Sequence, residues 1–138
     1  MIVSVKTNSR TQLVDITDEI SRAVASLSGG DDGWCLLYVP HTTAAVTINE
    51  SADPAVRADI ADMLDKLIPW EDGYRHLEGN SAAQIKATLV GSSEMVAIEG
   101  GRLVLGTWQG IFFCEFDGPR RRSIHVHVYG KQENAQRS

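Results

Sequence analysis

Four histidines are the residues of this chain with the most versatile chemistry. His41 directly follows an apolar run that ends at Pro40, and His76 lies in a polar, glycine-containing stretch. A histidine at a strand end or in a loop can direct its imidazole into a cleft, as a metal ligand or as a proton carrier. The same rings also suit structural hydrogen bonds, so residue type alone leaves both roles open.

His125 and His127 are two residues apart in a run of strand-forming residues. Because side chains alternate along a strand, both rings project from one face with Ser123, and Ile124 and Val126 face the core. Such a pair can hold a metal ion, because its side chains run parallel. The polar face of a half-buried strand also carries solvent-exposed histidines. The pair is therefore an alternative metal site.

The run 103–116 departs from ordinary strand composition. Branched and aromatic residues at its two ends favour a pleated strand. Between them, Trp108 and Gln109 stand between Gly106 and Gly110. Glycine inside a strand marks a bulge, or a place where backbone or ligand comes close. The run predicts either a ligand site or a tight turn within a sheet.

Charge limits the partners of the chain. Lys plus Arg number 13 and Asp plus Glu number 18, for a formal net charge of −5. Nucleic-acid binding needs a dense basic surface, so we expect no nucleic-acid partner. The consecutive arginines 120–122 still allow a local anion site. Nucleophile elbows, phosphate loops, zinc-ribbon cysteine pairs and metalloprotease motifs do not occur in the sequence.

The location of the protein is also predicted by the sequence. No apolar run approaches the ~20 residues that span a bilayer, and the first residues lack the basic-then-apolar pattern of a secretory signal. Cys35 and Cys114 both lie in apolar runs, which is typical of buried free thiols in a reducing compartment. We expect a cytoplasmic protein without a membrane partner.

The elements that position these residues follow from periodicity and turn signals. Asp53 and Pro54 begin a helix whose apolar stripe includes Ile60 and Leu64, and Thr17 or Asp18 is suited to cap another. Turn residues 8–10 would join the first two strands in a hairpin. Strands are predicted at 2–7, 12–16, 34–39, 43–48, 94–98, 102–105, 111–116 and 123–129, and helices at 18–28, 54–68 and 82–89.

This order predicts a single α+β domain, residues 1–130, whose sheet is mostly antiparallel. Residues 131–138 are predicted to be a polar C-terminal tail. At 138 residues, one domain is the natural count.

Short motifs spread over nearly the whole chain, from about Lys6 to Gly130, resemble the YjbQ-like family, whose members are often labelled secondary thiamine-phosphate synthases. The block Gly106-Thr107-Trp108-Gln109-Gly110 is the most specific of them. The others are His41-Thr42-Thr43-Ala44, Asn49-Glu50, Asp53-Pro54-Ala55-Val56, Tyr74-Arg75-His76, Glu78-Gly79, Ile85-Lys86-Ala87, Glu115 and Gly118-Pro119-Arg120-Arg121.

The resemblance implies an α+β sheet or sandwich domain with two to three helices, assembled as a homotrimer with sites near subunit boundaries. It also implies a pocket in which three imidazoles gather around a divalent metal, zinc or magnesium. Two of these map to His41 and His76, and the third falls at Gln84. A carboxamide is a weaker zinc ligand than an imidazole, so metal binding is weakened unless Glu78, Glu50 or a water completes the site.

The resemblance suggests roles for further residues. Glu50 would orient a ligating imidazole, and His41 or His76 would transfer protons. Trp108 would stack on a heteroaromatic ring. Phosphate groups would be neutralised by Lys86, Arg120 and Arg121, and neutral hydrogen bonds would come from Thr43, Asn80, Thr107 and Gln109.

The leading prediction is an enzyme that acts on a small phosphorylated molecule, with weak thiamine-phosphate synthase activity, assisted by a divalent metal, as the candidate. In that reaction a pyrimidine pyrophosphate joins a thiazole phosphate and expels pyrophosphate. One alternative is a metal-assisted hydrolase. The other is a non-catalytic trimer that binds a small anion or metal, which the glutamine at position 84 favours.

Overall fold

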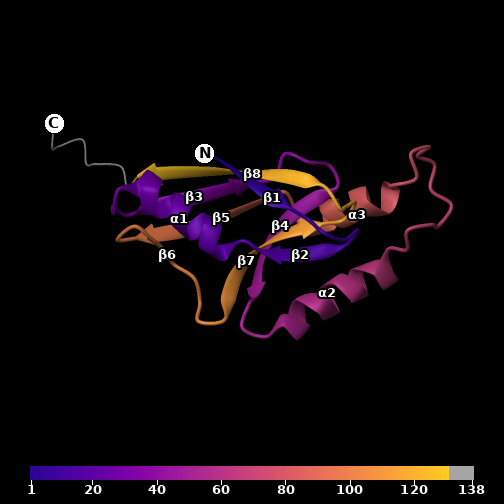
Figure 1. Ribbon diagram of the computed structural model, residues 1–138, viewed down its shortest axis with the longest axis horizontal. Helices are drawn as coiled ribbons and strands as arrows, with labels where there is room; N and C mark the ends of the chain where they lie inside the picture. Colours follow the sequence, from indigo (N-terminus) through magenta and orange to yellow (C-terminus); the bar gives the residue numbers. More distant parts are fainter. Residues whose placement is uncertain (131–138) are drawn as a thin grey trace.

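The computed structural model describes residues 1–130, which form two antiparallel sheets and three helices (Figure 1). The predicted tail, 131–138, lies outside the described residues. The helices are α1 (Thr17–Ser28), α2 (Pro54–Leu67) and α3 (Ser81–Val90). The strands are β1 (Ile2–Lys6), β2 (Gln12–Asp15), β3 (Gly33–Tyr38), β4 (Ala44–Glu50), β5 (Ser93–Glu99), β6 (Arg102–Leu103), β7 (Gln109–Glu115) and β8 (Arg121–Gly130).

One sheet has five strands in the order β1-β8-β3-β5-β6, and the other has three in the order β2-β7-β4. Every strand pair is antiparallel, which confirms the predicted α+β class. The hairpin predicted at residues 8–10 is wrong, because β1 pairs with β8 and β2 pairs with β7. Turn residues reveal where a chain bends but not which sheet receives the next strand.

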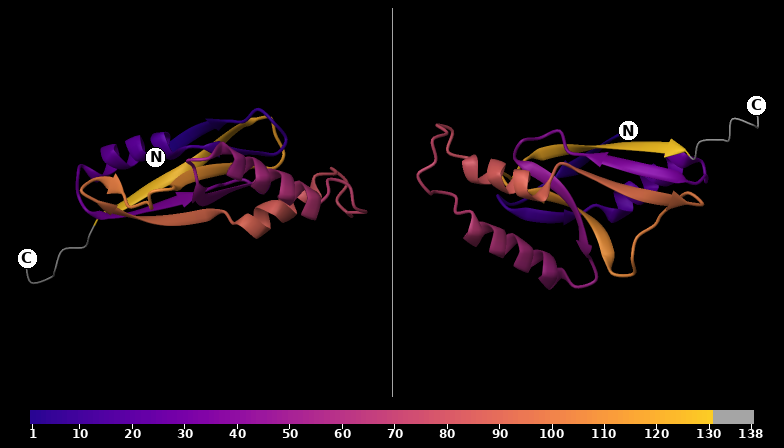
Figure 2. Two further views of the ribbon diagram at one scale, coloured as in Figure 1. Left: turned by 90° about the horizontal axis from the view of Figure 1, so that it is seen from below. Right: turned by 180° about the vertical axis from the view of Figure 1, so that it is seen from behind.

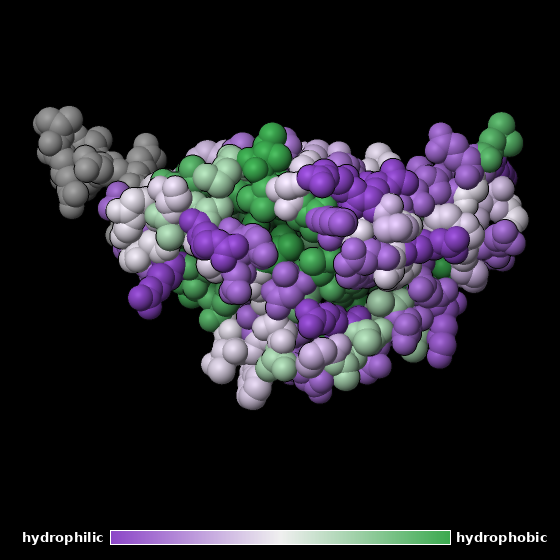
Figure 3. Space-filling view, viewed as in Figure 1, coloured by the Kyte–Doolittle hydropathy of each residue, from purple (hydrophilic) through white to green (hydrophobic). Residues whose placement is uncertain are grey.

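Two apolar cores follow from this arrangement. The first lies among the inner faces of both sheets and α1, and includes Ile20, Leu37, Phe113 and Val126. The second lies where α2 and α3 pack on the other face of the three-stranded sheet, around Phe112. Within residues 1–130, no helix covers the outer face of the five-stranded sheet, as the right panel of Figure 2 shows. On the opposite side, Figure 3 shows apolar residues gathered beside α1 with hydrophilic residues around them.

Three connections change sheets at the same end of the molecule. They join β1 to β2, β3 to β4, and β7 to β8, each passing from one sheet to the other. Main-chain hydrogen bonds tie the connections together: Thr7 donates to the carbonyl of Arg120, and Phe116 donates to that of Thr43. These connections, residues 7–11, 39–43 and 116–120, form one corner of the fold, which is called the corner below. The corner brings together residues that are far apart in sequence.

The helices differ from prediction at two places. No side chain caps α1, since Ile16 occupies the cap position and Thr17 is already helical. The hydroxyl of Thr17 instead accepts a hydrogen bond from the main-chain N–H of Ile111. The predicted apolar stripe of α2 is only half-buried, and Leu67 is 68% exposed. Asp53 does cap α2, as its carboxylate accepts from the N–H of Ala55.

Among residues 1–130, no helix has the length and apolar character to cross a membrane.

Gly110 occupies a position with no room for a side chain. A Cβ atom there would lie 2.6 Å from the Cβ of Ser51 and 2.9 Å from the Oγ1 of Thr17. We therefore expect Gly110→Ala to lower the free energy of unfolding by about 1–3 kcal/mol through overpacking, measured by urea denaturation. Gly130→Ala is the matched control, because no atom of the described residues lies within 4 Å of a Cβ at that glycine. Equal stability of the two variants would contradict this packing argument.

Candidate functional site

A buried ion pair forms the centre of the corner. Arg122, the second residue of β8, donates to both carboxylate oxygens of Glu115, the last residue of β7, at 2.5–3.2 Å. The guanidinium also donates to the hydroxyl of Thr43 at 2.7 Å, and the hydroxyl of Thr7 donates to Glu115 at 2.7 Å. Glu115 is fully buried and Arg122 is 5% exposed. Four residues from four strands or their flanks thus form one closed polar network.

Burial by itself would raise the pKa of Glu115. Hydrogen bonds from Arg122 and Thr7 outweigh that effect and hold the pKa of the carboxyl below its ordinary value. The carboxylate therefore stays ionised beside the guanidinium at neutral pH. The network is a fixed structural unit. Because both carboxylate oxygens of Glu115 already accept hydrogen bonds, this residue is not available as a general acid or base.

His41 lies directly beside this network, on the connection between β3 and β4. The main-chain N–H of Ser123 donates to Nε2 of His41 at 3.1 Å. Burial and the positive charge of Arg122 lower the pKa of the imidazole, so the ring is neutral at pH 7. The predicted proton-handling residue is therefore held by β8 in a defined orientation.

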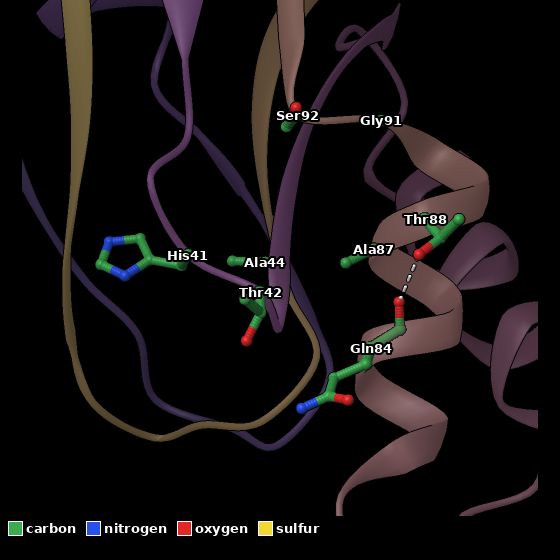
Figure 4. Close-up of a pocket in the computed structure, with 8 residues that line it drawn as sticks. All are labelled: His41, Thr42, Ala44, Gln84, Ala87, Thr88, Gly91 and Ser92. Carbon is green, nitrogen blue, oxygen red and sulfur yellow. Dashed lines mark hydrogen bonds between the residues drawn. The ribbon is translucent and has the colours of Figure 1, made fainter.

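A pocket of about 390 Å³ opens between His41 and α3 (Figure 4). The hydroxyl of Thr42 and the carboxamide of Gln84 point to the same side of it in that view. Thr88 donates its hydroxyl to the carbonyl of Gln84, so that hydroxyl is occupied. The lining residues are His41, Thr42, Ala44, Gln84, Ala87, Thr88, Gly91 and Ser92. The pocket combines polar side chains with the apolar surface of Ala44 and Ala87, and no charged residue lines it among residues 1–130.

His76 lines a neighbouring pocket of about 540 Å³ that shares Gln84 and Thr88 with the first. Its Nε2 is 3.9 Å from a carboxylate oxygen of Glu78. Figure 4 shows the ring of His41 extending away from Gln84. Zinc needs lone pairs converging on one point, and Nε2 of His41 already accepts a hydrogen bond. The donor set does not fit a three-ligand zinc site in this arrangement.

The other proposed metal pair also lacks further ligands. His125 and His127 project from the outer face of the five-stranded sheet, with ring centroids 6.2 Å apart. Within residues 1–130, no three His, Cys, Asp or Glu side chains are grouped so that they could hold a metal ion.

Lys86, predicted to neutralise a phosphate, does not line the pocket of His41. It is 1% exposed, and its Nζ binds the carboxylate of Asp65 on α2 at 2.5 Å. The side chain points from α3 to α2 and fixes one helix to the other. Lys86 thus has a structural partner in place of a substrate.

Asp65→Asn tests this structural role. Removing the carboxylate leaves a buried ammonium without its counter-charge, so we expect the free energy of unfolding to fall by about 1–3 kcal/mol. Asp62→Asn on the same helix is the control, because no ion pair within residues 1–130 involves Asp62. Urea denaturation of both variants measures the difference. A loss no larger than that of the control would contradict the structural assignment.

Four predicted residues lie far from His41. Glu50 ends β4 and pairs in register with Gln109, whereas the pocket of His41 adjoins Ala44 at the start of β4. β4 has seven residues, which is about 20 Å of strand. Glu50 therefore cannot orient the ring of His41, and Thr107, Trp108 and Gln109 share its remote position. The side-chain oxygen of Gln109 also accepts from the N–H of Gly106 at 2.7 Å, so residues 106–109 form a turn that leads into β7.

The remaining predicted residues lie around the corner. Thr43 is buried and bound to Arg122. Asn80 donates to the carboxylate of Asp117, which also binds the guanidinium of Arg120. Arg121 is exposed and faces Lys6 across β1 and β8. Arg121 alone of the predicted cations has no ion-pair partner among the described residues.

Sequence reasoning missed Arg122, Lys6 and Thr42. Arg122 looked like one of three equivalent arginines, but alternation along β8 turns it inward with Ile124 while its neighbours face out. That alternation is readable from the sequence and could have singled it out. The pairing of Lys6 with Arg121 depends on strand register, which no local signal provides.

Comparison with known proteins agrees with this fold. The family described as UPF0047 protein YjbQ-like matches residues 1–131. A UPF0047 protein of Methanocaldococcus jannaschii is 55% identical, covering 91% of each chain, and the UPF0047 protein YugU of Bacillus subtilis is 49% identical, covering 93% of this chain and 97% of that one.

Solved structures of relatives have the same arrangement. An uncharacterised YjbQ/UPF0047 protein of Clostridium acetobutylicum superposes with a TM-score of 0.90 at 51% identity, covering 94% of this chain and 99% of the other. A hypothetical protein of Aeropyrum pernix does so with a TM-score of 0.89 at 37% identity, covering 95% and 98%. The chain therefore belongs to the UPF0047, or YjbQ-like, family.

Proposed function

We propose that this protein is an enzyme that binds a small phosphorylated molecule at the sheet-switching corner. The observation that carries the proposal is an oriented, neutral imidazole at a pocket of the corner, together with two cations at the ends of β1 and β8 that form no ion pair within residues 1–130. His41, Thr42 and Gln84 supply the polar groups of the pocket. The ligand class is a phosphate ester or diphosphate.

Strand register supports an anionic ligand. Lys6 and Arg121 stand directly opposite each other on β1 and β8, and both are exposed. Like charges at such positions repel and destabilise the strand pair. No ion pair within residues 1–130 involves either residue. A bound phosphoryl group would relieve the repulsion, and an arginine can bind two of its oxygens at once.

The candidate reaction is weak thiamine-phosphate synthesis, as the family resemblance implies. The thiazole nitrogen forms a bond to the methylene carbon of the pyrimidine substrate, and the carbon–oxygen bond to pyrophosphate breaks. The electron pair leaves with pyrophosphate. Lys6 and Arg121 would stabilise the charge that develops on this leaving group. Because the donor set does not fit zinc, the proposal assigns no step to a metal.

The test is release of pyrophosphate from the pyrimidine diphosphate, with and without the thiazole phosphate. We expect release that depends on both substrates and falls at least tenfold in Arg121→Gln. The control is Arg102→Gln, an exposed arginine on β6 outside the corner. Release that does not require the thiazole phosphate would indicate a hydrolase and contradict synthesis.

A non-catalytic binding protein is the second candidate. Among the described residues, no carboxylate and no thiol lines the pocket of His41, and the imidazole is its single titratable group. Nε2 of that imidazole is already occupied by Ser123. Saturable phosphate binding without turnover of any phosphorylated substrate would favour this candidate.

We also propose that the chain assembles as a homotrimer through the outer face of the five-stranded sheet. Trp34 and Tyr129 stack there with ring centroids 4.7 Å apart, and the rings of His127, His125 and Tyr38 continue the row. The large apolar side chains of this outer face are 39–66% exposed: Ile2, Trp34, Tyr38, Met95 and Tyr129. A continuous apolar patch of this kind is typical of a protein interface.

A further inference from the structure

We propose that His41 acts as a hydrogen-bond donor through Nδ1 to a phosphoryl oxygen, and that Ser123 and Arg122 are the positioning residues that fix this tautomer. This inference rests on the proposed phosphate site and names the atom that contacts the ligand. It replaces the role of metal ligand that the family resemblance gives to His41.

The tautomer follows from one hydrogen bond. A main-chain N–H can only donate, so Nε2 of His41 must accept from Ser123 through its lone pair. A neutral imidazole carries one proton, which is then on Nδ1. Nδ1 therefore has no lone pair for a metal ion, and it offers an N–H to an acceptor.

The direction of Nδ1 fits the pocket. In Figure 4, Nε2 is the nitrogen turned toward β8, and Nδ1 lies on the side to which the Thr42 hydroxyl points. The carboxamide of Gln84 points to that side as well. In the proposal, a phosphoryl group on that side of the pocket accepts from Nδ1–H of His41 and from the hydroxyl of Thr42. A phosphoryl group presents several acceptor oxygens and no donor when fully ionised.

The buried network holds the imidazole against β8. Arg122 immediately precedes Ser123, and its Nη2 donates to the hydroxyl of Thr43, two residues after His41. The carbonyl of Thr43 in turn accepts from the N–H of Phe116. The network thus ties both the donor strand and the histidine segment to the same guanidinium. A ring that is fixed in advance loses less freedom when the ligand binds.

Ring-nitrogen NMR of the protein labelled with ¹⁵N in histidine tests the proposal. Protonated and unprotonated ring nitrogens have clearly separate shifts, and the His41 signals are assigned by their loss in His41→Gln. We expect the ligand-free protein to show Nδ1 protonated and Nε2 unprotonated at pH 7.5. Added inorganic phosphate should shift the Nδ1 signal of His41 saturably and leave those of His125 and His127 unchanged.

Three outcomes would overturn the inference. Protonation of Nε2 in the ligand-free protein would refute the tautomer, whether or not phosphate binds. If the tautomer is as predicted but the Nδ1 signal does not respond to phosphate, the donor role is refuted. The proposed phosphate site is refuted as well only if isothermal titration calorimetry also detects no phosphate binding. Loss of the Nδ1 proton on addition of one equivalent of zinc would make His41 a metal ligand.

Thr43→Val tests the positioning role, because it removes the hydroxyl that binds Arg122 while conserving side-chain shape. We expect His41 to become a mixture of the two tautomers and phosphate affinity to fall three- to tenfold. Thr43→Ser keeps the hydroxyl and should restore a single tautomer. A single Nδ1–H tautomer in Thr43→Val would contradict the role given to the network.

Discussion

Arg122→Met is expected to lower the free energy of unfolding by about 3–5 kcal/mol, the cost of leaving a buried charge without its partner. Glu115 is fully buried, and the guanidinium supplies three of its hydrogen bonds. Methionine fills part of the space but donates no hydrogen bond. Equilibrium urea denaturation at pH 7.5 measures the loss.

The neighbouring arginine provides the control for this variant. Arg121→Met changes an exposed residue of the same strand, and we expect a change within about 0.5 kcal/mol. A loss below about 1 kcal/mol in Arg122→Met would show that the ion pair does not support the corner. The double variant Arg122→Met/Glu115→Leu should recover much of the loss, because it removes the stranded charge as well.

The pH dependence of stability has a definite sign. The pKa of Glu115 is lowered in the folded protein, so the pair contributes fully above the ordinary glutamate pKa of about 4.3. This contribution is lost as the pH falls through the lowered value. In Arg122→Met, burial instead raises the pKa of Glu115, and protonation relieves the stranded charge. The stability gap between the two proteins should therefore begin to narrow as the pH falls through the raised pKa of the variant, above about 4.3, and narrow further as the wild-type contribution is lost below that value.

Trp34→Glu is expected to convert the proposed homotrimer into monomers. The indole lies on the outer face near the start of the central strand β3 and stacks on Tyr129. A carboxylate at a buried interface loses its hydration without gaining a partner, which costs more than a few contacts can offset. Sedimentation velocity should show the wild-type protein at three times the chain mass of 15.1 kDa and the variant at that mass.

Leu77→Glu is the control for assembly. Leu77 is fully exposed, on the connection between α2 and α3, away from the outer face. This variant should sediment like the wild-type protein. A Trp34→Glu protein that keeps the trimeric mass would exclude the outer face as the interface. A monomeric wild-type protein would contradict the homotrimer itself.

The fold could be predicted from the sequence to a large extent, because local signals decide most elements. The apolar run after Trp34, the Asp53–Pro54 helix start and the alternation at Ile124 and Val126 all mark elements that the structure contains. Which strands pair with each other was harder to predict from the sequence. β1 pairs with β8 and β2 pairs with β7, strands near the other end of the described chain, so no local signal shows that the sheet changes between β1 and β2.

The site was harder to predict than the fold. His41 and Gln84 do line one pocket, as the family resemblance suggested. Glu50 and Trp108 matched the same family pattern, yet they lie at the opposite end of β4. A motif match shows which residues recur within a family, but it does not show which of them lie close together in the folded protein. The role of Arg122 depends on its burial, which the alternation along β8 indicates, whereas its partners Glu115 and Thr43 come from distant parts of the chain that no local signal connects to it.

Isothermal titration calorimetry of inorganic pyrophosphate tests the central claim, that the corner binds phosphoryl groups. Wild-type protein should bind one pyrophosphate per chain in low salt. Both His41→Gln and Lys6→Gln should weaken binding at least fivefold, whereas His127→Gln on the outer face should not. Absence of heat in the wild-type protein, or equal binding by all three variants, would contradict the claim.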